Sequence, residues 1–132
     1  MNNTWYLLFA LVFVALTNQD DKLTASKARG EDIYTDFCIA CHMANGEGVP
    51  GAFPPLAGSD YLFEKTDAAI RGVKYGQQGE LIVNGITYNG IMSPLYLADD
   101  EVMDVMNFIL NSWGNQGEFI TLERVKSIIK NE

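Results

Sequence analysis

The sequence predicts a small all-α domain in which helices are joined by long loops, with a minor β-hairpin near residues 81–88. Three observations support this fold class. Residues 43–58 are rich in Gly and Pro and cannot form regular structure. An apolar stripe with helical spacing begins after Asp99, and Asn-Gly at 84–85 separates two short β-prone runs. The 132 residues, 48% of them hydrophobic, suffice for one domain with its own core.

A continuous apolar run, Trp5 to Leu16, follows the first four residues. This run is shorter than the ~20 residues of a membrane span and matches the apolar core of a signal peptide. No Lys or Arg precedes it and no A-x-A site follows it, so an uncleaved leader is the alternative. We therefore assign residues 1–17 to a signal peptide or N-terminal membrane anchor, and residues 18–29 to a polar connector. Both assignments place the domain outside the cytoplasm.

The first helix of the domain is expected from about Ala28 to Cys41. Four residues share one face of it at spacings of three and four, namely Gly30, Tyr34, Phe37 and Cys38. Gly30 lacks a side chain, so another element can approach the helix closely at this point, beside the aromatic ring of Tyr34.

Three further helices follow the long loop. Ser59 and Thr66 are the expected N-caps of two short ones. The clearest helix begins at Asp99, because three successive acidic residues there favour the positive end of a helix, and Gly114 ends it. Its apolar stripe consists of Val102, Val105, Met106, Ile109 and Leu110, extended by Phe108.

The last part of the chain is a C-terminal extension, residues 115–132, beyond a main domain that spans residues 30–114. Thr121 is the expected N-cap of a short amphipathic helix in this extension. The apolar residues on one side of that helix are Leu122, Val125, Ile128 and Ile129. We interpret the extension as packing against the domain.

The strongest chemical signal is the segment Cys38-Ile39-Ala40-Cys41-His42, which holds both cysteines and the only histidine. It matches the C-x-x-C-H pattern of covalent haem attachment. Two cysteines three apart on a helix lie on one face, so both sulfurs can form thioethers with one haem, and the next residue can direct its imidazole at the iron. We predict one covalently bound haem c, attached at Cys38 and Cys41, with His42 as an iron ligand.

Two other kinds of site could use this motif. A zinc site requires four ligands, and the chain offers only three strong ones, all within five residues. A thiol-disulfide site of the thioredoxin type needs a βαβ sheet, which the loop-rich pattern does not provide. A protein without covalent haem would revive these alternatives.

The second axial ligand of the iron decides between electron transfer and ligand chemistry. Met43 is too close to His42 to reach across the ring, and Met103 and Met106 lie in a predicted helix where core packing accounts for them. Met92 instead lies among turn-forming residues between the hairpin and the last major helix, which makes it our candidate ligand. The alternatives are a Tyr, a Lys, an amine, or an open iron site as in a haem sensor or enzyme, although the sequence supplies no distal His or Arg to activate a peroxide.

From Gly30 to Gly114 the chain resembles the class I cytochromes c of bacteria. The segment CIACH matches the haem-binding motif of that family. The resemblance implies a haem enclosed by three or more helices with one edge exposed. It also implies that the carbonyl of Pro54, in Pro54-Pro55-Leu56-Ala57-Gly58, accepts a hydrogen bond from His42. The segment Tyr88-Asn89-Gly90-Ile91-Met92 is similar to the one that presents the methionine ligand, so the implied axial pair is His42 and Met92.

Two other features bear on this resemblance. In that family the N-terminal and C-terminal helices pack against each other. Gly30 and Tyr34 resemble the contact residues of the N-terminal helix, and Val105 and Phe108 resemble their partners on the C-terminal helix. Ser93 is a departure, because many members have proline directly after the methionine and this chain places it at Pro94. The departure concerns the shape of the loop.

The function implied is one-electron transfer between redox partners through the exposed haem edge, without enzymatic activity. A methionine ligand is soft and favours ferrous iron. The alternative is a haem-bearing subunit of a larger complex, such as a nitrite reductase, an oxidase or a dehydrogenase, because the C-terminal tail resembles extensions found on some such members.

Charge and the leader predict the partners and the location. The net charge is −8, and from Lys27 onward the chain has 15 acidic residues and only eight Lys and Arg. Nucleic acid is therefore not an expected partner, and we predict a redox protein with a basic docking patch. The protein is expected in the periplasm, either soluble or tethered to the outer face of the inner membrane by an uncleaved leader. Membrane contact is expected only if that leader is retained.

Overall fold

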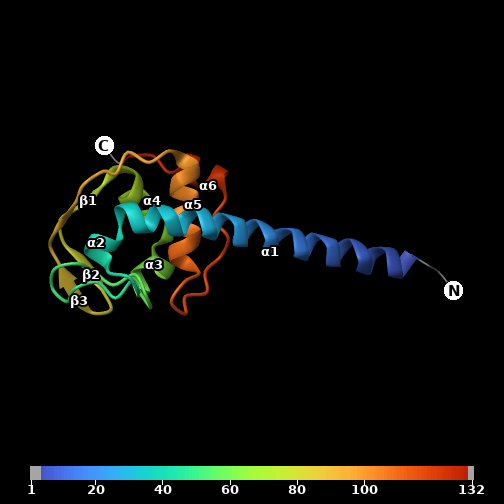
Figure 1. The fold of residues 1–132 in the computed structure, drawn as a ribbon, viewed down its shortest axis with the longest axis horizontal. Helices are drawn as coiled ribbons and strands as arrows, with labels where there is room; N and C mark the ends of the chain where they lie inside the picture. The colour runs from blue at the N-terminus through green and yellow to red at the C-terminus, as the bar shows by residue number, and fades with distance from the viewer. Residues whose placement is uncertain (1–3, 131–132) are drawn as a thin grey trace.

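The structure, a computed structural model, describes residues 4–130, with side chains from Gln19 onward. Helix α1 (Thr4–Phe37) runs into the short α2 (Ile39–His42), and its N-terminal half extends away from the domain (Figure 1). Helix α5 (Asp99–Leu110) crosses α1 within the domain. The other helices are α3 (Asp60–Glu64), α4 (Thr66–Tyr75) and α6 (Leu122–Ser127). The predicted fold class, helices and long loops with a minor hairpin, is confirmed.

The predicted signal peptide or membrane anchor, residues 1–17, lies outside the residues whose side chains are described. Within the described part of the chain, no helix is both long and apolar enough to cross a membrane.

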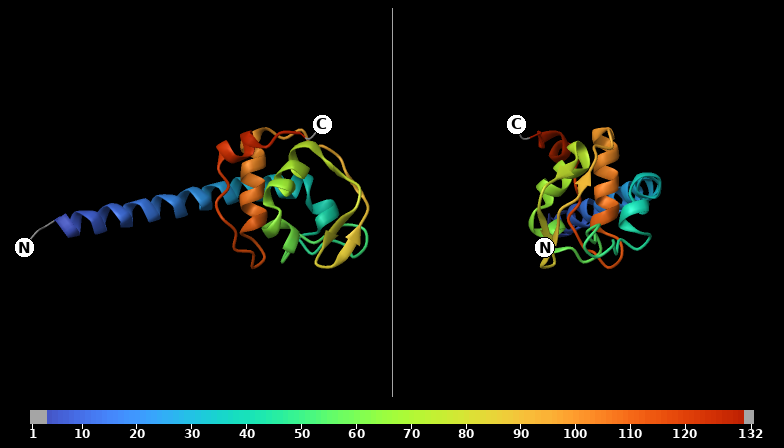
Figure 2. Two further views of the ribbon diagram at one scale, coloured as in Figure 1. Left: turned by 180° about the vertical axis from the view of Figure 1, so that it is seen from behind. Right: turned by 90° about the vertical axis from the view of Figure 1, so that its left-hand side faces the viewer.

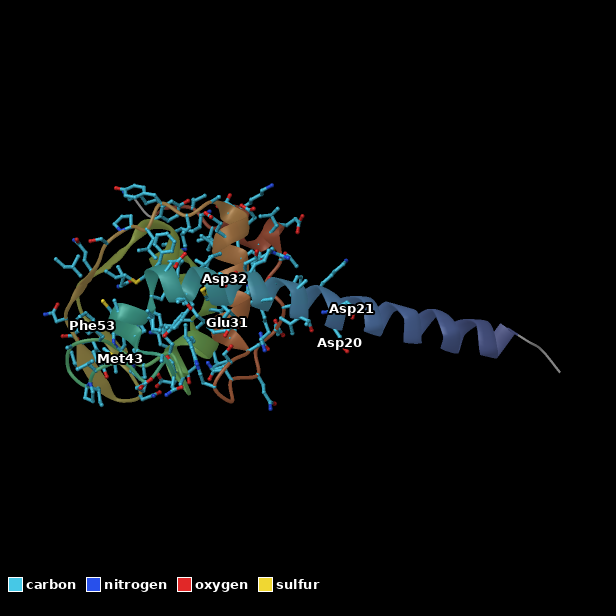
Figure 3. The ribbon with its side chains drawn as sticks, viewed as in Figure 1. Asp20, Asp21, Glu31, Asp32, Met43 and Phe53 are labelled. Atoms are coloured by element: carbon cyan, nitrogen blue, oxygen red, sulfur yellow. The ribbon has the colours of Figure 1, made fainter. Side chains whose placement is uncertain are left out.

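Helix α1 begins earlier than the sequence predicts. We expected it from about Ala28, after a polar connector, but residues 18–29 form turns of the same helix. This segment contains neither Gly nor Pro, and most of its residues are good helix formers. Its exposed side bears acidic side chains, of which Asp20 and Asp21 are labelled in Figure 3 together with Glu31 and Asp32, which lie further along the helix. Phe37 ends the helix, and Cys38 separates it from α2.

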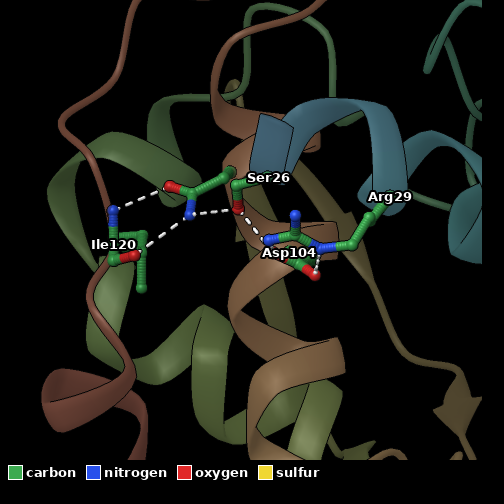
Figure 4. Close-up of polar contacts among 5 residues, drawn as sticks. Ser26, Arg29, Asp104 and Ile120 are labelled. Atoms are coloured by element: carbon green, nitrogen blue, oxygen red, sulfur yellow. Dashed lines mark hydrogen bonds and ion pairs between the residues drawn. The ribbon is translucent and has the colours of Figure 1, made fainter. Parts of the chain in front are cut away.

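Three polar side chains of the 18–29 segment attach α1 to α5 and the residue after it. Ser26 Oγ donates a hydrogen bond to Asp104 Oδ1 over 2.6 Å, and Arg29 Nε forms an ion pair with Asp104 Oδ2 at 2.6 Å (Figure 4). Lys27 Nζ donates to the backbone carbonyl of Asn111 over 2.6 Å. These contacts explain why the polar segment stays helical, since each side chain needs the helix to reach its partner.

Asn107 joins this network to the C-terminal extension (Figure 4). Its side chain is fully buried on α5. Its Nδ2 donates to Ser26 Oγ over 2.9 Å and to the carbonyl of Ile120 over 3.0 Å, and its Oδ1 accepts from the Ile120 N–H over 2.7 Å. Asn107 therefore satisfies both backbone groups of a buried residue that belongs to no helix or strand.

The close approach expected at Gly30 is present. A Cβ atom at this position would lie 2.1 Å from the carbonyl oxygen of Asp104, so only glycine allows α1 and α5 to cross here. One turn later the ring of Tyr34 lies 5.3 Å from that of Phe108, centroid to centroid. Phe37 does not share the buried face as predicted, because it ends α1 beyond the crossing and remains 50% exposed.

The predicted helix caps are correct at two of three positions. Ser59 Oγ accepts from the Leu62 N–H over 3.3 Å, and Thr121 Oγ1 accepts from the Arg124 N–H over 3.2 Å. Thr66 is not an N-cap. Because one residue alone separates α3 from α4, its hydroxyl instead donates back to the Leu62 carbonyl over 2.8 Å, in the last turn of α3.

The C-terminal extension packs on the domain, with one exception to the predicted pattern. Val125 and Ile128 are buried, whereas Ile129 is 70% exposed. Helix α6 ends at Ser127, so helical spacing no longer determines the side on which Ile129 lies.

The predicted hairpin is formed by β2 (Leu81–Val83) and β3 (Ile86–Tyr88), which pair antiparallel. Asn84 and Gly85 both have positive φ, 51° and 76°, as a type I′ turn requires. A second antiparallel pair, β1 (Gln77–Gln78) with β4 (Ile91–Met92), was not predicted, because two-residue strands carry no alternating pattern.

Candidate haem site

A cleft with two adjoining lobes, of about 650 and 610 Å³, opens between α2, α4 and the strands. In the left-hand view of Figure 2, α2 lies between α4 and the two strand pairs. Five residues line both lobes, namely His42, Pro54, Gln77, Leu81 and Met92. Apolar side chains dominate the rest of the first lobe, including Leu56, Leu62, Val73, Val83 and Ile109. Predominantly apolar walls with a few polar groups are typical of a site that binds an apolar ligand.

The three chemical groups of the motif face this cleft. Cys38 lines the first lobe, Cys41 lines the second, and His42 lines both. Both cysteines are free thiols, of which Cys38 is buried and Cys41 exposed. The short helix α2 places the second thiol and the imidazole next to each other in the chain. The cleft thus presents two thiols and one imidazole to a common space.

The imidazole of His42 is oriented by the backbone of the long loop. Its Nδ1 lies 2.9 Å from the carbonyl oxygen of Pro54, the partner that the family resemblance implied. A carbonyl oxygen only accepts hydrogen bonds, so Nδ1 carries the proton and Nε2 keeps its lone pair. Burial lowers the pKa of His42, although the bond to Pro54 acts in the opposite direction. A neutral imidazole with a free Nε2 is suited to bind a metal ion.

Met92 reaches the cleft from the strand pair on another wall. Of the other methionines described, Met43 and Met103 line neither lobe, and Met106 is buried in the core and lines only the first. The β1–β4 pairing places Met92 opposite Gln77. A Cβ atom at Gly76 would lie 2.7 Å from the Met92 carbonyl, so a glycine is needed for the two strands to meet here.

The sequence did not identify the groups that hold the loop around His42. Tyr34 Oη donates to the Met43 carbonyl over 2.7 Å, directly after the motif. Asn115 Nδ2 donates to the carbonyls of Leu56, over 3.0 Å, and of Ile109, over 2.8 Å, and so attaches the Pro54 loop to α5. A lone asparagine after a helix resembles an ordinary turn residue, so no pattern could have revealed this role.

The thiol chemistry of the two alternatives fits the structure poorly. Burial, with a smaller contribution from Cys41, raises the pKa of Cys38 to about 11, so at neutral pH it is a thiol and not the thiolate of a redox-active site. Among the residues with described side chains, no three His, Cys, Asp or Glu converge as ligands of a metal ion would. A zinc site would need ligands that this arrangement does not bring together.

A helical domain whose apolar cleft presents two thiols and an imidazole defines a haem-binding protein of the c type. The family model for cytochrome c matches residues 27–113. The chain therefore belongs to the cytochrome c family.

The relatives agree with this assignment. A cytochrome c-552 of Thermus thermophilus is 39% identical over 80% of this chain and 78% of its own length. The cytochrome c subunit of the quinone alcohol dehydrogenase of Gluconobacter oxydans is 29% identical over 65% of this chain, but over only 18% of its own length. The cytochrome c subunit of gluconate 2-dehydrogenase of Pantoea cypripedii is 28% identical over 86% of this chain and 28% of its own length.

Membership in the cytochrome c family confirms the predicted cofactor and the predicted class of function. The cofactor is one covalently bound haem c, and the chain is an electron-transfer protein whose partners are redox proteins. The apolar cleft, the two free thiols and the neutral imidazole fit this group. When bound, haem supplies an iron centre that gains and loses one electron.

Proposed function

We propose that the chain is a monohaem electron carrier that passes single electrons between redox partners outside the cytoplasm, through the open side of the cleft. The observation that carries the proposal is the convergence of the motif and Met92 on one apolar cleft. In this assignment Cys38 and Cys41 form the thioethers, and His42 and Met92 are the axial ligands.

Each of these residues has a distinct task. Pro54 holds His42 in one orientation and one tautomer, so that Nε2 is available without rearrangement. With haem bound, the thioether of Met92 would be the second ligand of the iron and, as a soft ligand, would favour the ferrous state. The apolar walls act in the same direction, since they disfavour the extra positive charge of the ferric state. A closed site exchanges electrons without binding a substrate.

A second candidate function is that of a haem-bearing subunit in a larger oxidoreductase. Two of the relatives are cytochrome c subunits of dehydrogenases, which favours this candidate. Purification of the protein from its native envelope distinguishes the two. A free carrier elutes as a monomer, and a subunit elutes with other chains.

We also propose a role for the leader and a location for the domain. Residues 1–17 act as a signal peptide, or as an anchor if they are retained, and the domain works in the periplasm. An intact mass of the purified protein reports both attachment and processing. We expect the added mass of one haem, and the presence or absence of the leader separates the anchored from the soluble form.

Exposure of the reduced protein to carbon monoxide tests the carrier function. With Met92 bound, we expect the reduced spectrum to remain unchanged and voltammetry to show one reversible one-electron wave. Rapid formation of a carbon monoxide complex by the native protein would contradict the closed site and favour a sensor or an enzyme.

A further inference from the structure

Basic side chains gather on one face of this acidic chain. The face consists of α4, residues 93–98 and residues 122–130, and we call it the α4/α6 face. Five of the nine Lys and Arg of the chain lie on it, namely Arg71, Lys74, Arg124, Lys126 and Lys130. Two adjoining hollows on the face share Tyr75, Pro94 and Lys130. Four of the five basic residues line these hollows, against a single acidic residue, Asp99.

Two of the five basic side chains of the face form ion pairs, Lys74 with Asp99 at 2.9 Å and Arg124 with Asp67 of α4 at 2.8 Å. Within residues 19–130, the three other basic residues of the hollows, Arg71, Lys126 and Lys130, form no ion pair. A concave surface with several unpaired cations attracts anions even when the molecule as a whole is negative, because local charge dominates within a Debye length.

Side chains of α4 hold residues 125–129 against the face through hydrogen bonds to their backbone carbonyls. Arg71 Nε donates to the Ile129 carbonyl over 3.1 Å. Lys74 Nζ donates to the carbonyl of Val125 over 2.9 Å, and Tyr75 Oη donates to that of Ile128 over 3.1 Å. The basic residues of the extension are therefore presented by a docked segment, which lowers the entropy lost when a partner binds.

Tyr96 gives the face an exposed aromatic anchor. It lines one of the hollows, is 89% exposed, and has a positive φ of 57°. An aromatic residue in the left-handed region is strained, and its exposure means that packing within the chain does not offset the strain. Exposed tyrosines are frequent at the energetic centres of protein interfaces.

The extension contributes charges that the family match does not include. The match ends at residue 113, whereas Lys126 and Lys130 belong to the C-terminal extension. One hollow also contains Ile91 and Met92, which line the second lobe of the cleft. A partner on this face would therefore lie beside the Met92 wall.

We propose that the α4/α6 face docks an acidic protein surface, whose carboxylates bind Arg71, Lys126 and Lys130 and whose apolar side chain packs on Tyr96. This inference goes beyond electron transfer, because it concerns binding alone. It also differs from the partner expected from net charge, which would carry a basic patch.

The test is an NMR titration of the ferrous holoprotein at low ionic strength with an acetylated Glu-Glu-Leu-Leu-Glu-Glu peptide. We expect amide shifts in residues 71–76, 93–98 and 126–130, with an affinity that falls as salt is added. The double variant Lys126→Glu/Lys130→Glu should bind about tenfold more weakly. The matched control Lys22→Glu/Lys65→Glu, which has the same net charge, should bind within about twofold of the native protein. If the charge-reversal variant Lys126→Glu/Lys130→Glu does not fold, the neutral variant Lys126→Gln/Lys130→Gln is used in its place.

The variant Tyr96→Asn separates the role of Tyr96 in binding the peptide from its effect on the stability of the fold. Asparagine tolerates a positive φ, so we expect an unchanged or higher thermal midpoint together with weaker peptide binding. Equal affinities for the native protein and the double reversal would overturn the proposal, as would an equal loss in the Lys22/Lys65 control. Self-association of the native protein that the double reversal abolishes would also overturn it, since the acidic surface would then belong to a second copy.

Discussion

Asn107→Ala is expected to destabilise the protein more than a typical single substitution. The side chain makes three buried hydrogen bonds, of 2.7, 2.9 and 3.0 Å, to Ile120 and Ser26. Loss of three such bonds costs about 3 kcal/mol, and leaving the buried Ile120 N–H without a partner costs about 1–2 kcal/mol more. We therefore expect the free energy of unfolding to fall by about 4–5 kcal/mol, and the thermal midpoint to fall by roughly 10–20 °C.

Guanidinium unfolding of the ferric holoprotein, followed by far-ultraviolet circular dichroism, measures this change. Asn111→Ala is the matched control, because its side chain makes one half-buried bond, from Nδ2 to the Asn107 carbonyl at 3.2 Å. The control should lose about 1 kcal/mol or less. A loss below about 1 kcal/mol for Asn107→Ala, or equal losses in the two variants, would refute the claim that this network holds the extension on the domain.

Two further predictions concern stability. Gly30→Ala places a Cβ atom 2.1 Å from the Asp104 carbonyl, so α1 and α5 must separate, and we expect a loss of about 3 kcal/mol in the same unfolding assay. An unchanged midpoint would contradict the close crossing. Burial lowers the pKa of Lys74, but its hydrogen bonds to Asp99 and Tyr75 and the attraction of their charges together outweigh burial, so the pKa lies above its usual value of 10.5. Because the folded-state pKa is the higher one, the stabilisation is complete below the unfolded-state pKa of about 10.5 and is lost as the pH rises through the folded-state pKa. Lys74→Met should therefore lose less stability than the native protein as the pH is raised above about 10.5, and parallel curves of stability against pH would refute this origin.

Sequence reasoning predicts those parts of the fold that local chemistry determines. Asn84-Gly85 forms the expected turn because both residues tolerate positive φ. Ser59 and Thr121 cap their helices, since a hydroxyl at that position reaches the backbone two or three residues later. The motif and Met92 were identified from residue type and spacing, and the structure brings them to one cleft.

The features that sequence reasoning missed depend on contacts between distant parts of the chain. The polar residues Ser26 and Arg29 resemble a linker until Asp104, far along the chain, is placed beside them. Thr66 has the residue type of an N-cap, but the preceding helix ends so close that its hydroxyl bonds backwards. The positive charge of the α4/α6 face cannot be seen in a net charge of −8, because it arises where α4 meets the extension.

His42 and Met92 are proposed to close both axial positions of the iron. The most direct test is the absorption spectrum of the ferric protein, in which a methionine-to-iron bond gives a weak far-red band. We predict this band in the native protein and in Met103→Leu, whose side chain lines neither lobe of the cleft. Met92→Ala should lose the band, and its reduced form should bind carbon monoxide. A native protein without the band, or a Met92→Ala variant that keeps it, would contradict the account.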